Sequence, residues 1–326
     1  MDTVESQRLG MHVRESGSPG APAVVFLHGV GNSGGMWSRH MDRLEQFHCL
    51  APDLPGFGRS NHSPWTTREE ITKKIAALIQ TRIPEGRGHV VGLSLGGSIA
   101  HTLLARHSDV LHRVVIDGCG VLPWWGTGLM KAGVAAISPF LHTEPVIGIV
   151  ANAFGFDDDT RADMRAASTR AFARGFADAN DTRLTQEELA ASCPTLLVAG
   201  ELEKAPPVRA SNAALAALMP QAEARYVAGK GHGWLGEEPD LHIGMVQAWL
   251  TDQELPDTLL TETSSWDTGA VSSVTSMTCG GDETAVGYNS SNVSSMSACT
   301  DLISPMVRPW LSIACQIVSS PRPQPP

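Results

Sequence analysis

The chain has 326 residues, of which 42% are hydrophobic, and this is enough for one large domain or two smaller ones with a buried core. The composition excludes a disordered or fibrous protein. The formal net charge of -10 argues against nucleic acid as a partner, because phosphate groups attract surfaces rich in Lys and Arg.

No stretch approaches the roughly 20 apolar residues that span a bilayer, and residues 1–20 lack the apolar centre of a signal peptide. We therefore expect a soluble, cytoplasmic protein without a membrane span. The six cysteines are scattered, without paired spacing or the density of a secreted disulfide scaffold, so we expect free thiols.

Short apolar runs alternate with helical patterns along most of the chain. The predicted strands are residues 23–27, 49–51, 89–91, 113–116, 195–199 and 225–227. The predicted helices are residues 36–47, 68–83, 95–106, 208–219 and 241–250. Strands that alternate with helices predict an α/β fold, with a mostly parallel sheet covered by helices on both faces.

Two segments depart from this alternation. Residues 119–192 are apolar and mostly helical, and we interpret them as a cap that carries Trp124, Trp125, Met130, Phe140, Phe154 and Phe156. Past Leu250 the composition shifts to Ser and Thr with Gly, which cannot bury enough apolar surface to offset conformational entropy. The predicted organisation is a core in two parts, 1–118 and 193–250, a helical cap over 119–192 and a disordered tail over 251–326.

The sequence Gly92-Leu93-Ser94-Leu95-Gly96 directly follows the predicted strand 89–91 and opens the predicted helix 95–106. This is the setting of a nucleophile elbow, a sharp turn that lifts a serine hydroxyl clear of the sheet edge. Glycine is needed on either side of the serine because the main chain passes too close for side chains. The pattern predicts Ser94 as a nucleophile.

A serine nucleophile needs a base within hydrogen-bond reach, and the base must itself be oriented. Among twelve histidines, His232 lies in Gly229-Lys230-Gly231-His232-Gly233, just after the last predicted strand, where glycines let a loop fold back toward Ser94. Most of the others we interpret as solvated or capping residues of surface helices, among them His101, His107 and His112.

The third member should be an acid that follows a strand between the serine and the histidine. Glu203 fits best, since it lies three residues beyond Gly200, after the predicted strand 195–199. Asp117 ends the preceding predicted strand and is the alternative acid, and Glu201 is a weaker alternative.

An oxyanion hole should complete such a site, because backbone N–H groups stabilise the charge that develops in the transition state. His28-Gly29-Val30-Gly31 ends the first predicted strand beside the elbow. We predict the amides of Val30 and Leu95 as the two donors, and His28 as a structural residue that bonds the loop.

Four motifs together resemble the α/β-hydrolase superfamily, in its branch of capped serine esterases, haloperoxidase-like proteins and carbon–carbon bond hydrolases. They are His28-Gly29-Val30-Gly31, the DLPGFGRS of residues 53–60, Gly92 to Gly97, and Gly231-His232. The resemblance covers roughly residues 6–250 and implies the α/β-hydrolase fold, a Ser-His-acid triad and no cofactor or metal. The family usually places aspartate where Glu203 stands. Relatives that hydrolyse haloalkanes or epoxides carry aspartate at the position of Ser94, so those activities are not expected.

The resulting hypothesis is hydrolysis of a carboxylic ester with a small or medium apolar group, through an acyl-enzyme on Ser94. Thioester, lactone or carbon–carbon bond hydrolysis would use the same triad, and sequence does not separate them. A small-molecule receptor of the same fold is the alternative from another class, which multiple turnover would exclude.

Overall fold

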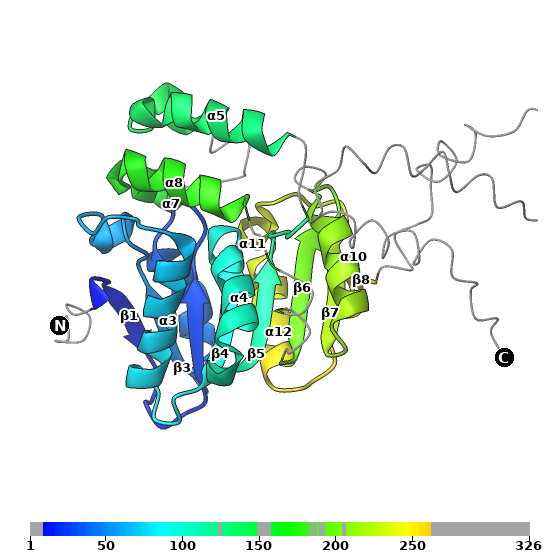
Figure 1. The fold of residues 1–326 in the computed structure, drawn as a ribbon. Coiled ribbons are helices and arrows are strands. Elements are labelled where there is room, and N and C mark those ends of the chain that lie inside the picture. Colours follow the sequence, from blue (N-terminus) through cyan, green and yellow to red (C-terminus); the bar gives the residue numbers. More distant parts are fainter. Residues whose placement is uncertain are drawn as a thin grey trace, which may run out of the picture. The chain divides into compact units, whose positions relative to one another are not determined.

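A computed structural model describes residues 9–122, 126–148, 158–181, 184, 188, 193–203 and 207–261 (Figure 1). The chain divides into two compact units, Met1–Leu260 and Thr261–Pro326. The fold described below belongs to the first unit. Residues 262–326 of the predicted tail lie outside the described residues, as do Trp124, Trp125, Phe154 and Phe156 of the predicted cap.

Within the described residues, an eight-stranded sheet has the order β1-β3-β2-β4-β5-β6-β7-β8. The strands are β1 (Val13–Ser16), β2 (Ala23–Leu27), β3 (His48–Pro52), β4 (Gly88–Leu93), β5 (Leu111–Asp117), β6 (Thr195–Gly200), β7 (Ala222–Val227) and β8 (Leu259–Leu260). Strands β2 to β7 pair in parallel, and every residue of β2, β3, β4 and β6 is buried. Continuous apolar runs of this kind are typical of strands covered on both faces. The predicted mostly parallel sheet is confirmed.

The two outermost strands, β1 and β8, pair antiparallel with their neighbours and were not among the predicted strands. β1 has the sequence VRES and is partly exposed along its whole length, and β8 has only two residues. Edge strands pair on one side only, so they need no continuous apolar run. This is why hydrophobicity alone did not indicate them.

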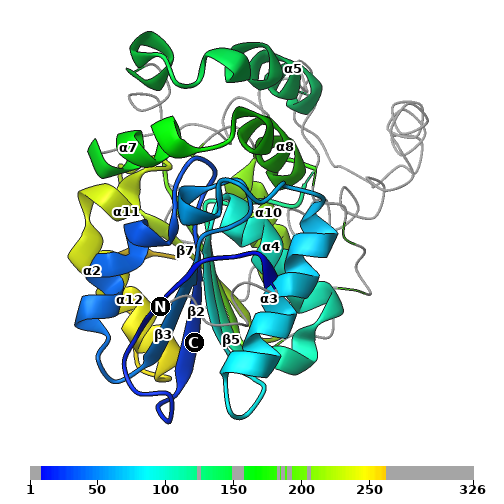
Figure 2. The same cartoon turned by 90° about the vertical axis from the view of Figure 1, so that its left-hand side faces the viewer.

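Helices cover both faces of the sheet, which confirms that part of the prediction (Figure 2). On one face lie α2 (Ser38–Arg43), α11 (Trp234–Glu237) and α12 (Pro239–Leu250), and on the other lie α3 (Arg68–Arg82), α4 (Leu95–Arg106) and α10 (Val208–Leu218). Short 3₁₀ turns are η1 (Gly34–Trp37), η2 (Gly58–Ser60), η3 (Ser108–Val110) and η4 (Ser138–Phe140). The helix expected over residues 36–47 is shorter than predicted, because it begins as η1 and α2 ends at Arg43.

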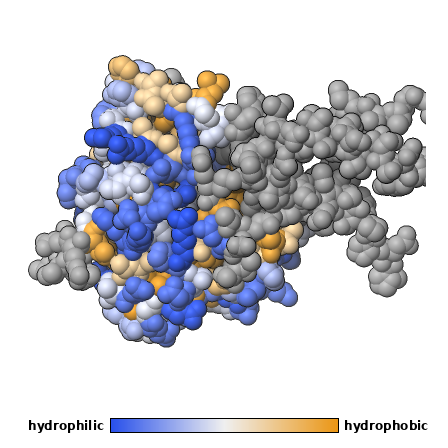
Figure 3. All heavy atoms as spheres, in the orientation of Figure 1, coloured by the Kyte–Doolittle hydropathy of each residue, from blue (hydrophilic) through white to orange (hydrophobic). Residues whose placement is uncertain are grey.

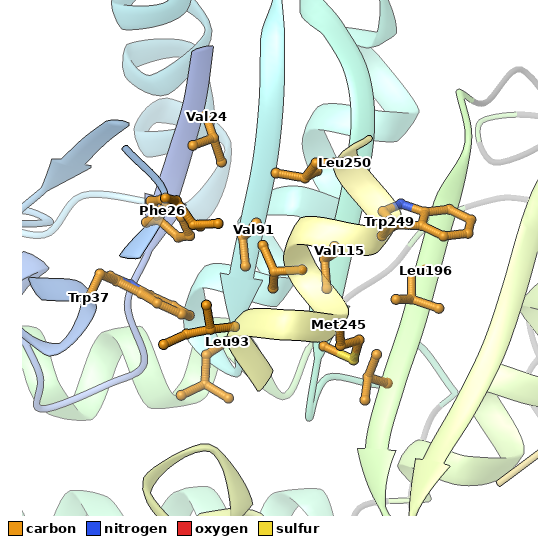
Figure 4. Close-up of a cluster of buried hydrophobic side chains, with 14 of the residues drawn as sticks. Val24, Phe26, Trp37, Val91, Leu93, Val115, Leu196, Met245, Trp249 and Leu250 are labelled. Atoms are coloured by element: carbon orange, nitrogen blue, oxygen red, sulfur yellow. The ribbon is translucent and has the colours of Figure 1, made fainter. Parts of the chain in front are cut away.

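A large apolar cluster fills the space between the sheet and α12 (Figure 4). Phe26 and Trp37 stack with ring centroids 5.2 Å apart, and both are fully buried. From α12, Trp249 packs on the same cluster and its Nε1–H donates to Val114 O at 3.0 Å. Burial of such aromatic side chains fixes α12 against β5.

Helices α5 (Thr127–Ile137), α7 (Asp158–Ala166) and α8 (Thr169–Ala179) come from the segment predicted as a cap and lie over one end of the sheet (Figures 1 and 2). α8 packs on the core, since a Cβ on Gly56 would lie 2.0 Å from Ala171 Cβ. α5 buries none of its residues, and Leu129 is 77% exposed. Apolar surface gathers over this helix at the top of the view in Figure 3.

The chain beyond Leu250 adds β8 to the sheet. Tyr226 and Val227 of β7 pair with Leu260 and Leu259, and Leu259 is 5% exposed. Buried residues at this strand therefore follow the polar stretch that marks the change in composition.

We predict that a chain ending after Thr261 keeps the thermal unfolding midpoint of the full-length protein, because β8 and Leu259 remain in place. A chain ending after Thr251 loses both, and the lost burial of Leu259 corresponds to about 1.5 to 3 kcal/mol. Its midpoint should fall by roughly 3 to 10 °C in a thermal melt followed by circular dichroism. Equal midpoints for the two shortened chains would contradict this role of β8.

Candidate active site

Ser94 occupies a strained turn between β4 and α4. Its φ is 53° and its ψ is -107°, a left-handed conformation that costs a non-glycine residue about 1 to 3 kcal/mol. Neighbouring backbone holds the turn, since Ser94 N–H donates to Asp117 O at 2.8 Å and Gly96 N–H donates to His28 O at 3.1 Å. The turn carries Ser94 beyond the end of β4, as the elbow prediction requires.

The glycines around Ser94 are needed for close backbone contact. A Cβ on Gly92 would lie 2.5 Å from Gly96 O, and a Cβ on Gly96 would lie 2.1 Å from Leu27 O. Both distances are far below van der Waals contact with main-chain atoms, which cannot move aside. The clash expected from the motif is therefore present in the structure.

His232 and Glu203 are hydrogen-bonded to each other. His232 Nδ1–H donates to Glu203 Oε2 at 3.0 Å, because a carboxylate can only accept, and Gly200 N–H donates to Glu203 Oε1 at 2.9 Å. Burial opposes the charged imidazolium, but the neighbouring carboxylates of Glu203 and Asp117 outweigh it and raise the pKa of His232. Glu203 thus engages Nδ1 of His232, and His232 lines the same cavity as Ser94.

Asp117 lies at the end of β5 but does not take the Nδ1 contact of His232. It is 1% exposed, and its Oδ1 accepts from Trp234 Nε1–H at 3.1 Å. Burial and the charge of Glu203 raise the pKa of Asp117 to about 8. Glu203, and not Asp117, therefore makes the hydrogen bond to His232 Nδ1. Glu201 instead accepts from Gly229 N–H at 2.8 Å.

The loop after β2 supports the predicted oxyanion donors. His28 is fully buried, its Nδ1–H donates to Gly29 O at 2.7 Å, and its Nε2 accepts from Leu54 N–H at 2.9 Å. Burial lowers the pKa of His28, so a neutral ring suits these two bonds. A Cβ on Gly29 would lie 3.7 Å from Ser94 Cβ, which places the loop directly beside the serine.

The two predicted donors, Val30 and Leu95, come from the loop after β2 and from the start of α4. Val30 follows Gly29 in this loop and lines the same cavity as Ser94. Leu95 is the first residue of α4, where backbone N–H groups have no partner within the helix and the helix dipole favours negative charge. Their positions are compatible with an oxyanion hole.

A cavity of about 980 Å³ opens at Ser94 and His232. Its wall includes Val30 from the loop after β2. Apolar side chains line much of the remainder, and they come from the core and from cap helices α5 and α8: Leu93, Met130, Val134, Ile137, Phe172 and Phe176. Acidic side chains of α7, Asp159 and Asp163, line another part of the cavity.

Several residues of the site were not predicted from sequence. Gly118, at φ 60°, packs on the imidazole, because a Cβ there would lie 2.7 Å from His232 Cε1. Trp234 and His242 contact Asp117 from α11 and α12. A glycine directly after a strand that ends in Asp117 was an available signal, whereas nothing local indicated Trp234 or His242.

The interpretation of His101 as a surface residue is wrong. It is fully buried in α4, where its Nε2 lies 3.4 Å from Cys119 O. Burial lowers its pKa to about 4. α4 is covered by the sheet on one side and by α3 and α8 on the other, so even its polar-looking positions face protein.

Comparison with known proteins identifies the family of the chain. The model of the Alpha/beta hydrolase family matches residues 24–241. The chain belongs to this family. An AB hydrolase superfamily protein of Gibberella zeae is 28% identical over 265 residues, which cover 74% of this chain and 85% of that protein.

Two further matches of this α/β hydrolase are to proteins with named activities. Lipase LipV of Mycobacterium tuberculosis is 36% identical over 112 residues, which cover 33% of this chain and 42% of the lipase. The enol-lactonase of Burkholderia xenovorans LB400 superposes with a TM-score of 0.61 at 24% identity, over 74% of this chain and 96% of the lactonase. The latter likeness is one of fold.

Two negative findings apply to the part of this α/β hydrolase that the structure describes. None of its helices is long and apolar enough to cross a membrane. No cluster of three or more His, Cys, Asp or Glu side chains in that part could hold a metal ion.

We predict that Glu203→Gln lowers kcat of this α/β hydrolase by roughly 10² to 10⁴, because the amide keeps the shape but loses the charge that stabilises a protonated His232. Asp117→Asn should have a far smaller effect, since Asp117 bonds Trp234 and not His232. Steady-state kinetics of both variants measure the difference. A large loss of kcat in Asp117→Asn, with a nearly normal kcat in Glu203→Gln, would assign the acid role to Asp117 instead.

We also predict that Gly118→Ala lowers kcat by roughly 10² or more, because the new methyl group displaces the imidazole of His232 and small misplacements of a catalytic group are costly. Gly86→Ala is the matched control. Gly86 has φ 64° and nothing within 4 Å of its added Cβ, so only the backbone strain is shared. Equal activity of the two variants, with both folded by circular dichroism, would contradict the contact with His232.

Proposed function

We propose that this α/β hydrolase cleaves a carboxylic ester with a small or medium apolar group, through an acyl-enzyme on Ser94. The observation that carries the proposal is the shared cavity of Ser94 and His232, together with the 3.0 Å contact of His232 Nδ1 with Glu203. A nucleophile at a strained turn and a base oriented by a buried acid are the requirements for acyl transfer by serine.

In the proposed mechanism, Ser94 Oγ attacks the ester carbonyl and its proton passes to His232 Nε2. The Glu203 carboxylate holds Nδ1–H and stabilises the imidazolium, which agrees with the raised pKa of His232. The carbonyl oxygen becomes an oxyanion that the amides of Val30 and Leu95 would stabilise, each by roughly 3 kcal/mol. The imidazolium then protonates the leaving alcohol.

Hydrolysis of the acyl-enzyme repeats these steps with water. Water gives a proton to His232 Nε2 as its oxygen attacks the acyl carbonyl, and the imidazolium returns the proton to Ser94 Oγ as the acid leaves. Apart from the ester and water, the proposed cycle uses only side chains and backbone amides of the chain. The same residues serve in both halves of the reaction.

The walls of the cavity support an apolar substrate group. Met130 and Val134 of α5 and Phe172 of α8 line the cavity that Ser94 and His232 share. Phe172 also packs on the loop after β2, because a Cβ on Gly31 would lie 3.0 Å from Phe172 Cε2. The similarity to a lipase supports an ester as the scissile bond.

We predict that Ser94→Ala removes ester hydrolysis without changing the unfolding midpoint, since loss of a triad member costs several orders of magnitude in rate. The measurement is hydrolysis of p-nitrophenyl esters of graded acyl length, with thioester and lactone substrates in parallel. The largest kcat/KM should fall on an ester of short or medium chain, at multiple turnover. Labelling by a fluorophosphonate should disappear in the variant.

Two outcomes would refute the proposal. Ser94→Ala with more than about a tenth of the parent activity would exclude Ser94 as the nucleophile. A single slow burst in place of turnover, for every ester tested, would favour a receptor that uses the same pocket.

A further inference from the structure

A second line of ionisable side chains lies beside the proposed triad. Asp117 of β5, His242 of α12 and His40 of α2 are each at most 1% exposed. Asp117 Oδ2 lies 3.6 Å from His242 Nε2, and His242 Nδ1 lies 2.8 Å from His40 Nε2. Three elements far apart in sequence thus meet in one chain of contacts, and the proposed mechanism uses none of these side chains.

The chain of contacts is incompletely hydrogen-bonded. Asp117 Oδ2, His242 Nε2 and His40 Nδ1 are buried atoms without a hydrogen-bond partner. A buried polar atom without a hydrogen-bond partner is destabilising, so three of them in one cluster do not serve stability. Apolar side chains of similar size would pack the same space at lower cost.

The protonation of the Asp117 carboxyl is linked to the tautomer of His242. In the contact between His242 Nδ1 and His40 Nε2, one nitrogen carries the proton and the other accepts. If His40 donates, neutral His242 has its proton on Nε2, pointed at an Asp117 carboxylate. If His242 donates, its Nε2 is bare and faces a protonated Asp117. The charge on Asp117 and the tautomer of His242 therefore change together.

Both histidines remain neutral near pH 7. Burial lowers the pKa of His242 to about 3, and burial, with the charges of His242 and Arg39, lowers that of His40 well below its usual value. Asp117 is the member that can change charge, because burial and the charge of Glu203 raise its pKa to about 8. An N–H from His242 supports the ionised carboxylate against these effects.

The charge on Asp117 acts on the imidazole of His232 through space, and two contacts hold the two residues close together. Trp234, two residues after His232, donates from Nε1 to Asp117 Oδ1, and the backbone of Gly118 packs on the imidazole of His232. Asp117 of β5 and His232 of the loop after β7 face each other, and both face Glu203 of the loop after β6. Asp117 also faces His242 of α12, which in turn contacts His40 of α2.

We propose that His242, supported by His40, is a positioning residue that controls the charge on Asp117 and through it the basicity of His232. A carboxylate at Asp117 attracts the imidazolium of His232 and favours proton transfer from the nucleophile. A protonated, neutral Asp117 does not attract the imidazolium of His232. The inference rests on His232 acting as the base in the proposed function, but the interaction itself exists without turnover.

The test is an NMR pH titration of the His232 imidazole in Ser94→Ala protein, with the resonance assigned by its loss in His232→Gln. Asp117→Asn and His242→Phe should each lower the pKa of His232 relative to the parent. The double variant should lower it no further than the larger single effect, because both changes remove the same charge. His242→Gln, whose amide N–H can still approach Asp117 Oδ2, should leave the pKa of His232 nearer to the parent value than His242→Phe does.

His89→Phe is the matched control. His89 is a buried histidine at the start of β4, about 15 Å along the strand from Ser94, and burial lowers its pKa to about 4. The control should lose stability without moving the pKa of His232. If His242→Phe does not fold, the comparison of Asp117→Asn with His242→Gln still tests the inference, since only Asp117→Asn should lower the pKa of His232.

An unchanged pKa of His232 in Asp117→Asn or in folded His242→Phe would overturn the inference, as would additive shifts in the double variant. These outcomes are independent of ester hydrolysis, because the titration uses protein that lacks Ser94. Absence of turnover in the parent would refute the proposed function alone. Intact turnover with an unchanged titration would refute the inference alone.

Discussion

The backbone turn at Ser94 is the constraint on which the site depends. Its left-handed φ is tolerated because Ser94 N–H bonds Asp117 O and Gly96 N–H bonds His28 O, so the two neighbouring strands β5 and β2 hold it from both sides. Strain of this kind persists only where the surrounding structure over-determines it. The parallel sheet, buried on both faces, supplies that rigidity and places the serine between the loops that carry its partners.

Two carboxylates near His232, those of Glu203 and Asp117, make hydrogen bonds to different partners. Glu203 takes Nδ1 of His232, while Asp117 takes the indole of Trp234 and faces His242. Like charges so close together disfavour double ionisation, which agrees with the raised pKa of Asp117. Glu203 contacts the imidazole of His232 directly, and Asp117 can influence it only through charge and through the loop that holds it.

The cap helices add an apolar wall to a polar site. α8 is anchored through close contact of Ala171 with Gly56, and its Phe172 lies on the loop after β2 at Gly31. α5 contributes Met130 and Val134 to the cavity but buries none of its own residues. Helix α8 is therefore tied to the core, whereas α5 is held by few buried contacts, as is typical of segments of low local stability.

The sequence by itself determined the alternation of strands and helices, the elbow at Ser94 and the loops of His232 and Glu203, because each depends on local periodicity or on glycine at close spacing. It left Glu203 and Asp117 as rival acids, since Asp117 ends a strand and Glu203 follows one, both before His232. The tertiary structure decided between their contacts through the 3.0 Å bond to Glu203 and the indole bond to Asp117. It also decided that His101, His40 and His242 are buried, because burial depends on which elements pack together across the sheet, and no local pattern carries that information.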